Sequence, residues 1–311
     1  MIETSIVIPS YRRPDLLART LAGCLAQQSV DSPCEIIVID NDPAGSAEPV
    51  LAGFASQTSI PLRYVLEPRP GISYARNTGV AAACGRYVVF IDDDEEPDPG
   101  WLAAFLAVIR SGRADLAVGP VYPRFPPSVA ADAYRQRRYT RDAGMPTGTP
   151  LPRWSGIGNA ILDKSRCFIG NEPFDPRFGL TGGEDTIFLR QIMRRGRKLV
   201  WCAEAAVRES VPAERLAPRY LLKRAFRGGQ AATYVCAAVT PPEPLRALRL
   251  MVFGAVQVVL YGSAALILRL LRHDRWLPLM DKAAAGLGKV LWHPRLHFQL
   301  YRQNATPSAA A

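Results

Sequence analysis

Residues 87–96 read YVVFIDDDEE, an apolar run followed directly by five acids. The run is too short for a helix and rich in Val, which predicts a buried strand. Carboxylates this close together repel one another, so an acidic cluster at the end of a strand requires a cation. Oxygen ligands favour Mg²⁺ or Mn²⁺, and alternation along an extended chain predicts that Asp92 and Asp94 point to the same side. The alternative interpretation is a solvated acidic turn.

Similar short apolar runs recur on both sides of this stretch. Helical patterns lie between them at 14–25, 73–83 and 101–109. This alternation predicts an α/β fold with a mostly parallel sheet flanked by helices. Ligands of such sheets bind beyond the carboxyl ends of the strands, where Asp40 and Asp92 stand. The five predicted strands are Ser5–Pro9, Glu35–Asp40, Leu62–Leu66, Tyr87–Asp92 and Leu116–Gly119.

The charge of the 311-residue chain is distributed unevenly. Residues 1–211 contain 24 Lys and Arg against 24 Asp and Glu, whereas residues 212–311 contain 14 against 4. We therefore expect two parts, a catalytic domain at 1–211 and a basic helical tail at 212–311. An excess of positive charge confined to the tail indicates an acidic partner there, either membrane lipid or nucleic acid.

Cysteine and histidine usage excludes several classes of enzyme. The six Cys are scattered without a C-x-x-C pair, which is typical of a chain in a reducing cytosol and argues against a zinc ribbon. All three His lie at or beyond residue 273, so the first 272 residues contain no Ser-His-Asp triad and no His metal ligand. Residues 1–4 lead straight into a strand-like run, and we expect no signal peptide. Chemistry in the neutral part must then use carboxylates, hydroxyls or an oxygen-bound metal.

A second acidic motif and a long irregular segment complete the neutral part. Residues 180–186 read LTGGEDT, in which two Gly allow close approach and two acids open a predicted helix at 186–195. The alternative is that Glu184 and Asp185 are ordinary first-turn acids. Residues 120–155 show no sustained apolar period apart from a short helix near 132–139, and loops of this length are usually binding loops or lids.

The tail contains an apolar run that is long enough to enter or span a membrane. Leu250–Leu268 has nineteen residues without a charge, flanked by Arg246 and Arg249 before it and by Arg269 and Arg272 after it. This length just meets the transmembrane criterion, and flanking arginines can reach lipid head groups. A buried core helix is the alternative. Residues 276–292 form a weaker apolar stretch, either an interfacial helix or the return arm of a hairpin.

Several motifs together resemble family 2 glycosyltransferases over residues 4 to about 230. The pieces GISYARN, FIDDDE, GGEDT and KRAFRGGQ further resemble bacterial exopolysaccharide glucosyltransferases of the succinoglycan type. The resemblance implies a GT-A nucleotide-diphosphosugar transferase fold and transfer with inversion from a UDP-sugar, glucose first, to a lipid-linked oligosaccharide. Together with the apolar basic tail, the cytosolic location of UDP-sugars predicts that the enzyme lies on the cytoplasmic face of the inner membrane. The motifs are Pro9-Ser10-Tyr11, Asp40-Asn41-Asp42, Ala75-Arg76-Asn77, Asp92-Asp93-Asp94, Gly158-Asn159-Ala160 and Glu184-Asp185.

The resemblance also implies roles for single residues. Asp185, beside Glu184, matches the catalytic base, and Asp94 with Asp92 matches the ligands of Mg²⁺ or Mn²⁺. Asn41 replaces a second acid that many relatives carry at the base pocket. The residues matched to binding of the nucleotide-sugar are Pro9, Ser10, Tyr11, Asp40, Asn41, Arg76, Asp92 and Asp93.

The remaining matches are weaker in pattern. Arg224 and Arg227 stand where relatives hold the diphosphate with a Q-x-x-R-W motif, which this chain lacks; basic residues at 215–227 also suit a helix on a membrane surface. Arg76 has the alternative of a helix-surface residue, and Trp154 that of a core residue. The residues expected on the acceptor side are Trp154, Asn159, Gly182 and Gly183.

The sequence agrees less well with other classes of protein. The chain has no G-x-G-x-x-G, which argues against a dinucleotide-dependent oxidoreductase. A glycoside hydrolase also uses two carboxylates but has no need of an acidic triplet on a strand. A catalytically inactive membrane scaffold of the same fold, or a protein that binds nucleic acid through its basic tail, stays the alternative. We expect UDP-sugar, a lipid-linked saccharide and membrane lipids as partners, and no nucleic acid.

Overall fold

The computed structural model describes residues 1–28, 32–129, 132–293 and 296. The chain divides into two compact units. The first comprises Met1–Phe125, Gln136–Gly179 and Glu184–Val211, and the second comprises Pro126–Arg135, Leu180–Gly183 and Pro212–Ala311.

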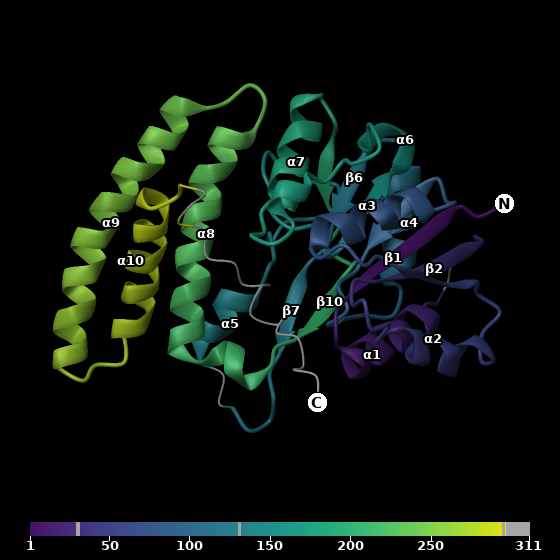
Figure 1. Ribbon diagram of the computed structural model, residues 1–311, viewed down its shortest axis with the longest axis horizontal. Coiled ribbons are helices and arrows are strands. Elements are labelled where there is room, and N and C mark those ends of the chain that lie inside the picture. Colours follow the sequence, from purple (N-terminus) through teal and green to yellow (C-terminus); the bar gives the residue numbers. More distant parts are fainter. Residues whose placement is uncertain (29–31, 130–131, 294–295, 297–311) are drawn as a thin grey trace. The chain divides into compact units, whose positions relative to one another are not determined.

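A seven-stranded sheet forms the centre of the first unit (Figure 1). Its strand order is β3-β2-β1-β4-β8-β6-β9, and β8 alone runs antiparallel to its neighbours. The mostly parallel sheet expected from the sequence is confirmed. The strands are β1 Thr4–Ser10, β2 Cys34–Asp40, β3 Leu62–Leu66, β4 Tyr87–Phe90, β6 Leu116–Val118, β8 Ala160–Asp163 and β9 Leu199–Trp201.

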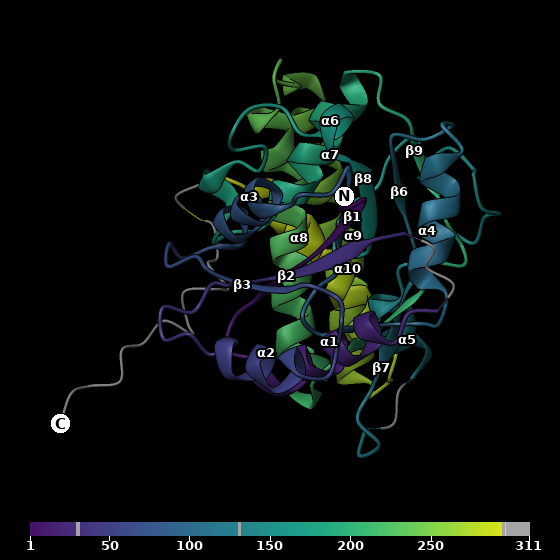
Figure 2. The ribbon, with the colours of Figure 1, turned by 90° about the vertical axis from the view of Figure 1, so that its right-hand side faces the viewer.

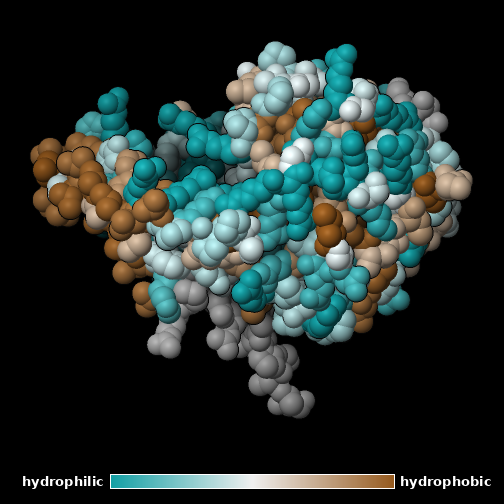
Figure 3. All heavy atoms as spheres, turned by 90° about the horizontal axis from the view of Figure 1, so that it is seen from above, coloured by the Kyte–Doolittle hydropathy of each residue, from teal (hydrophilic) through white to brown (hydrophobic). Residues whose placement is uncertain are grey.

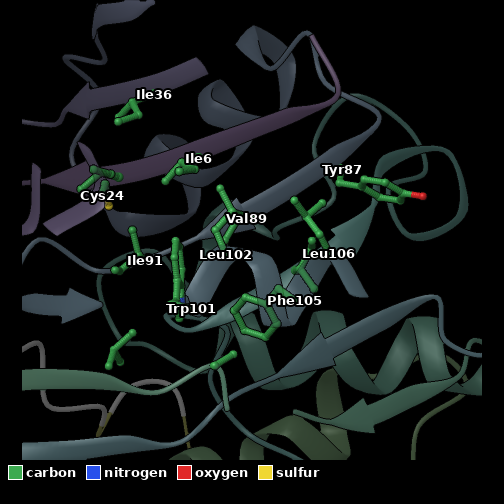
Figure 4. Close-up of a cluster of buried hydrophobic side chains, with 14 of the residues drawn as sticks. Ile6, Cys24, Ile36, Tyr87, Val89, Ile91, Trp101, Leu102, Phe105 and Leu106 are labelled. Atoms are coloured by element: carbon green, nitrogen blue, oxygen red, sulfur yellow. The ribbon is translucent and has the colours of Figure 1, made fainter. Parts of the chain in front are cut away.

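Helices cover both faces of this sheet (Figure 2) because the strands are apolar on both sides. Ile6 and Ile8 point into one buried cluster, shown in Figure 4, and Val7 between them points into the other. The helices of the first cluster are α1 Pro14–Leu25, α2 Glu48–Ala55 and α4 Trp101–Arg110. Those of the second cluster are α3 Ile72–Ala82, α6 Lys164–Cys167 and α7 Glu184–Arg194.

Shorter elements follow the strand ends. A three-stranded sheet of order β5-β10-β7 begins directly after Asp94. Its central strand, β10 Val207–Ser210, pairs with β5 Glu95–Pro97 on one side and with β7 Val121–Arg124 on the other. The sequence did not predict this sheet because strands of three or four residues show no measurable alternation. The remaining elements of this region are α5 Ala133–Tyr139 and the 3₁₀ turn η1 Pro176–Phe178.

One detail of the acidic motif differs from the expectation. Strand β4 ends at Phe90, and the backbone N–H of Glu95 donates to the carbonyl of Asp92 at 3.1 Å, which closes a turn. The extended-chain argument that placed Asp92 and Asp94 on one side is therefore wrong. In the segment 120–155 the predicted short helix is present as α5, while residues 130 and 131 lie outside the described residues.

The second unit is built from helices. After the 3₁₀ turn η2 Ala213–Leu216 come α8 Pro218–Ala238, α9 Pro244–Leu270 and α10 Trp276–Val290. Helix α10 contacts both α8 and α9 (Figure 1). Glycines make these contacts close: a Cβ at Gly229 would lie 2.0 Å from the carbonyl oxygen of Ala285 on α10.

Asn159 joins parts of the first unit that are distant in sequence. The residue is buried, and its Oδ1 accepts from Nε1 of Trp101 at 2.8 Å. Its Nδ2 donates to the carbonyls of Pro120 at 3.0 Å and Ala205 at 2.8 Å. All of these bonds stay inside the protein, so Asn159 is a scaffold residue. Asn159 also lines a small hollow beside Trp154, and its expected place on the acceptor side stays a prediction.

We expect Asn159→Leu to lower the free energy of unfolding by about 2–4 kcal/mol, because three buried partners lose their hydrogen bonds. Urea unfolding followed by circular dichroism measures this. The control is Gln57→Leu, which removes a side-chain amide bond to the carbonyl of Gly53 on the surface and should change stability by less than about 0.5 kcal/mol. Equal effects of the two variants would contradict the role of Asn159.

Candidate active site

The polar ends of four neighbouring strands define the site. In the sheet order β3-β2-β1-β4, these strands are followed by or end at Glu67, Asp40, Ser10 and Asp92. The four strands are parallel, so their carboxyl ends meet at one edge of the sheet, where α/β proteins bind ligands. Glu67 was not among the predicted residues, although its place directly after the third strand is the same signal.

Asp93 ties the acidic motif to the end of β1. Its Oδ2 accepts from Oγ of Ser10 at 3.0 Å and from the backbone N–H of Tyr11 at 3.3 Å, and its Oδ1 accepts from Nη1 of Arg13 at 3.0 Å. Burial raises the pKa of Asp93, and the charge of Arg13 opposes that shift. The predicted segment Pro9–Tyr11 therefore contacts the acidic motif directly.

Asp94 lies in an environment that disfavours an ionised carboxylate. Burial, followed by the charges of Glu209 and Asp93, raises the pKa of Asp94 to about 7. Nη1 of Arg13 lies 2.9 Å from Oδ2 of Asp94 and so bridges two neighbouring carboxylates. Arg13 was missed by the sequence analysis. Its only signal was its place immediately before the helix that follows β1.

Glu95 and Arg141 form an ion pair beside the same turn. Glu95 is fully buried, and its Oε1 accepts from Nη2 of Arg141 at 2.8 Å. Burial, followed by the charge of Asp92, raises the pKa of Glu95 well above its usual range. Oε2 of Glu95 accepts from the backbone N–H of Asp92 at 3.3 Å, and Arg141 also reaches Glu209 at 3.4 Å. Arg141, which the sequence analysis missed, belongs to the long irregular segment.

Arg76 and Glu184 form a buried ion pair between α3 and α7. Nη2 of Arg76 also lies 3.6 Å from Oδ1 of Asp92. The Arg76 side chain is 5% exposed, whereas that of Asp92 is 34% exposed. Arg76 is therefore not a helix-surface residue, and it fixes the first turn of α7 beside the acidic motif. Its predicted contact with the nucleotide stays a prediction.

Asp185 follows Glu184 but has a different environment. It is partly exposed, and its Oδ1 accepts from the backbone N–H of Thr186 at 2.6 Å. Its Oδ2 lies 3.8 Å from the position that a Cβ would take at Gly156. Asp185 therefore faces the loop that leads into β8.

That loop brings the two acidic motifs together. Gly156 has φ +94°, a left-handed conformation that favours glycine. Two residues later, a Cβ at Gly158 would collide with the carboxylate of Asp92. The stretch 156–158 thus lies against Asp185 at one end and against Asp92 at the other. The predicted catalytic and metal-binding residues are neighbours across this loop.

Asp40 and Asn41 are occupied by the protein itself. The Asp40 carboxylate is buried and accepts from the backbone N–H groups of Asp42 at 3.0 Å and Ala47 at 2.7 Å. The Asn41 amide donates to the carbonyl of Glu67 at 2.7 Å. These side chains fix the loops that follow β2 and β3. Their predicted role in reading the base stays a prediction.

Trp154 contributes to the same edge from the irregular segment. Its ring lies 5.2 Å from that of buried Trp201, and the residue is only partly buried. It lines a small hollow together with Arg141, Gly156 and Gly158. Trp154 therefore combines a packed face with a place beside the acids.

The other predicted residues belong to the second unit. Gly182 and Gly183 have φ values of +75° and +102°. A Cβ at Gly182 would lie 3.1 Å from Nη2 of Arg227 on α8, the helix that also carries Arg224. The roles of these four residues toward acceptor and diphosphate stay predictions.

Comparison with known proteins decides the family. Residues 5–164, more than half of the chain, match the family model described as Glycosyl transferase family 2. The chain is a family 2 glycosyltransferase. This glycosyltransferase is 30% identical over 237 residues to the succinoglycan biosynthesis protein ExoM of Rhizobium meliloti (strain 1021), and the match covers 74% of each chain. It is also 34% identical over 118 residues to the chondroitin synthase of Escherichia coli, a match that covers 17% of the synthase.

Solved structures show the same fold. The mannosyltransferase PcManGT from Pyrobaculum calidifontis, in complex with GDP-Man and Mn²⁺, superposes with a TM-score of 0.58 at 17% identity, over 93% of this chain and 87% of that one. GalNAc-T7, solved with UDP, GalNAc and Mn²⁺, gives a TM-score of 0.52 at 18% identity, over 68% and 44%. The glycosyltransferase therefore has the GT-A fold expected from the sequence.

Proposed function

We propose that this enzyme transfers a hexose, glucose as the first choice, from a UDP-sugar to a lipid-linked oligosaccharide with inversion at the anomeric carbon. The observation that carries the proposal is the loop 156–158, against which both Asp92 and Asp185 lie. A donor-side acid and a partly exposed candidate base are thereby neighbours. The similarity to ExoM, a succinoglycan biosynthesis protein, supports a role in exopolysaccharide synthesis.

The environments of the two helix acids favour Asp185 as the base. A sugar hydroxyl is a poor nucleophile, so a carboxylate must take its proton during attack. Glu184 is buried and bound to Arg76, which leaves its carboxylate in an ion pair. Asp185 is partly exposed and faces the loop 156–158. Single displacement with one such base gives inversion, and Glu184 acts by positioning.

The residues of the acidic motif fit a divalent cation. Among residues 1–28, 32–129, 132–293 and 296, no three His, Cys, Asp or Glu side chains form a complete metal cage. Mg²⁺ and similar ions are commonly held by one or two carboxylates together with substrate phosphates. Burial and the neighbouring charges of Glu209 and Asp93 raise the pKa of Asp94, so a cation beside it would stabilise the ionised form. Asp94 and Asp92 would hold the cation, which supplies positive charge to the diphosphate leaving group.

The second unit supports work at a membrane. The helix α9, Pro244–Leu270, is long and apolar enough to span a bilayer, and 11% of its most apolar 18-residue window is buried. A buried core helix would hide most of that window. We propose that the unit attaches the enzyme to the cytoplasmic face of the inner membrane, where a lipid-linked acceptor presents its sugar. Attachment raises the effective concentration of that acceptor.

A direct test measures UDP release over a panel of UDP-sugars, with membrane extract as the acceptor source. The proposal expects one UDP-sugar to be consumed faster when the extract is present. Consumption of GDP-sugars alone would contradict the proposed donor. Binding to nucleic acid without turnover of any nucleotide-sugar would favour the non-enzymatic alternative.

We expect Asp185→Asn to lower transfer by about 10²–10⁴-fold while UDP-sugar binding stays nearly unchanged, because the amide keeps the shape but cannot accept a proton. Calorimetry with the donor and a turnover assay measure the two effects. Asp15→Asn is the matched control, since Asp15 is also an acid in the first turn of a helix. If Asp185→Asn keeps more than about a tenth of the activity, Asp185 is not the general base.

The metal role predicts that donor binding requires Mn²⁺ or Mg²⁺. In Asp94→Asn this dependence should disappear together with activity, because one of few carboxylate ligands is lost. Calorimetric titration of UDP-glucose with and without Mn²⁺ measures it, and Asp142→Asn, at an exposed turn, serves as control. Full activity of the wild type in excess EDTA would contradict the metal role.

A further inference from the structure

The middle of helix α9, Leu250–Leu268, carries no charged residue. Its inward stripe follows a seven-residue repeat, and its outward side is aliphatic, with Val259 65% exposed and Leu266 55% exposed. Figure 3 shows such hydrophobic side chains gathered at the left of the view. Surface helices of water-soluble proteins carry polar residues on that side. The inward stripe is Ala247, Met251, Gly254, Val258, Tyr261, Ala265 and Leu268.

Small residues hold the inward stripe tightly on α10. A Cβ at Gly254 would lie 2.5 Å from the carbonyl oxygen of Gly286, and one at Gly286 would lie 2.6 Å from the carbonyl oxygen of Gly254. Further along, Gly262 approaches Ala283. Such close backbone contact makes α9 and α10 a packed pair, so α9 does not enter a membrane alone.

Charged residues of α10 meet the middle of the apolar run. Nζ of Lys289 donates to Oε1 of Gln257 at 2.5 Å, and Nζ of Lys282 lies 4.8 Å from the ring centre of Tyr261. If α9 crossed a bilayer, both lysines would lie near its centre. A charged side chain at the centre of a bilayer is strongly unfavourable. Helix α10, with fifteen residues, is also too short to return across the bilayer.

We propose that α9 lies in the plane of the membrane surface, with its outward aliphatic side in one leaflet and α10 on the water side. This inference rests on the membrane attachment proposed above and specifies its geometry. The occupant of the exposed side is a lipid surface with anionic head groups, because arginines flank the run at both ends. These arginines are Arg246, Arg249, Arg269 and Arg272, and each is exposed.

Depth measurement on vesicles of phosphatidylcholine and phosphatidylglycerol tests the geometry. Single cysteines at Val252, Val259 and Leu266 carry a fluorophore that brominated lipids quench, in full-length protein in which Cys34 and Cys84 are replaced by Ser. These positions are seven residues apart, about 10 Å along the helix. An in-plane helix gives equal depths. Depths that change steadily from 252 to 266 would overturn the proposal in favour of a span.

Flotation separates this inference from the proposed activity. Val259→Asp with Leu266→Asp should lower the vesicle-bound fraction by at least about tenfold, because charges replace buried aliphatic groups. Ile169→Asp, at an exposed apolar residue of the first unit, should have no effect. Calorimetric binding of UDP-glucose should be unchanged in both variants. Wild-type protein that stays lipid-free, or that buries this side in a dimer, would overturn the inference without contradicting sugar transfer.

A separate observation concerns Arg13. Its Nη1 lies 3.0 Å from Oδ1 of Asp93 and 2.9 Å from Oδ2 of Asp94, so one nitrogen bridges two carboxylates. The Arg13 side chain is 32% exposed. A guanidinium group binds phosphate at least as readily as carboxylate. A nucleoside diphosphate at the site would therefore offer Arg13 a second class of partner.

We infer that Arg13 competes with a divalent cation for Asp94 and makes cation binding depend on the donor. Without donor, the guanidinium neutralises the carboxylate that the cation needs. With donor, the diphosphate offers Arg13 another anion, and Asp94 becomes available. The inference rests on the metal role of Asp94 proposed above, and it makes Arg13 a positioning residue.

Paramagnetic resonance of Mn²⁺ tests this without measuring turnover. Without donor, Arg13→Gln should bind Mn²⁺ at least about tenfold more tightly than the wild type, a change of roughly 1.4 kcal/mol. With saturating Mn²⁺, the same variant should bind UDP-glucose more weakly. Arg12→Gln, whose Nε donates to Asp42 at 3.1 Å, is the neighbouring control and should match the wild type in both measurements.

Equal Mn²⁺ affinity of wild type and Arg13→Gln would overturn the inference. Arg13→Lys keeps the charge and guards against a folding defect, and it should bind Mn²⁺ no more tightly than the wild type. A wild type that binds no Mn²⁺ even with UDP-glucose would overturn both this inference and the metal role. A wild type that shows the expected Mn²⁺ behaviour but transfers no sugar would contradict the proposed transfer and leave this inference standing.

Discussion

The free-energy cost of burying carboxylates at the end of β4 determines which side chains surround this site. A charge removed from water must be paired or it destabilises the fold. Five acids gather there within reach of three guanidinium groups. The acids are Asp92, Asp93, Asp94, Glu95 and Glu209; the guanidinium groups belong to Arg13, Arg76 and Arg141. The acids outnumber the guanidinium groups, and burial together with the neighbouring carboxylates raises the pKa values of Asp94 and Glu95.

Compensation of these charges also organises the surrounding chain. Arg13 comes from the loop after β1, Arg76 from α3 and Arg141 from the long irregular segment. Each therefore attaches its own element to the acidic turn. Arg76 additionally pairs with Glu184, which fixes the start of α7 and leaves the next residue, Asp185, partly exposed. One electrostatic requirement thus gives two adjacent acids different environments, one buried in an ion pair and one partly exposed.

The second unit obeys a different constraint. Its helices approach closely through glycine, so backbone contact rather than bulky side chains holds α9 to α10. This arrangement leaves large aliphatic side chains of α9 on the outside, where water makes them unfavourable. The net positive charge of the chain comes from the same region, residues 212–311. A helix that is apolar along one side and cationic at both ends suits a membrane surface. Its apolar side contacts the acyl chains, and its cationic ends contact the anionic head groups.

The sequence alone was enough to predict the architecture and to identify most acidic residues of the candidate site. Hydrophobic periodicity and strand-end motifs are local features of the chain, so they can be recognised without the structure. Short runs such as Ser5–Pro9 predicted the parallel sheet, and the acids at 92–94 and 184–185 pointed to the candidate site. The tertiary structure decided which side chains meet. The turn after Phe90, the burial of Asn159 and the partners of Arg13 and Arg141 were not predictable from spacing. Arg13 is about eighty residues from Asp94 in sequence, and no local pattern encodes a contact that only the closing of the sheet creates.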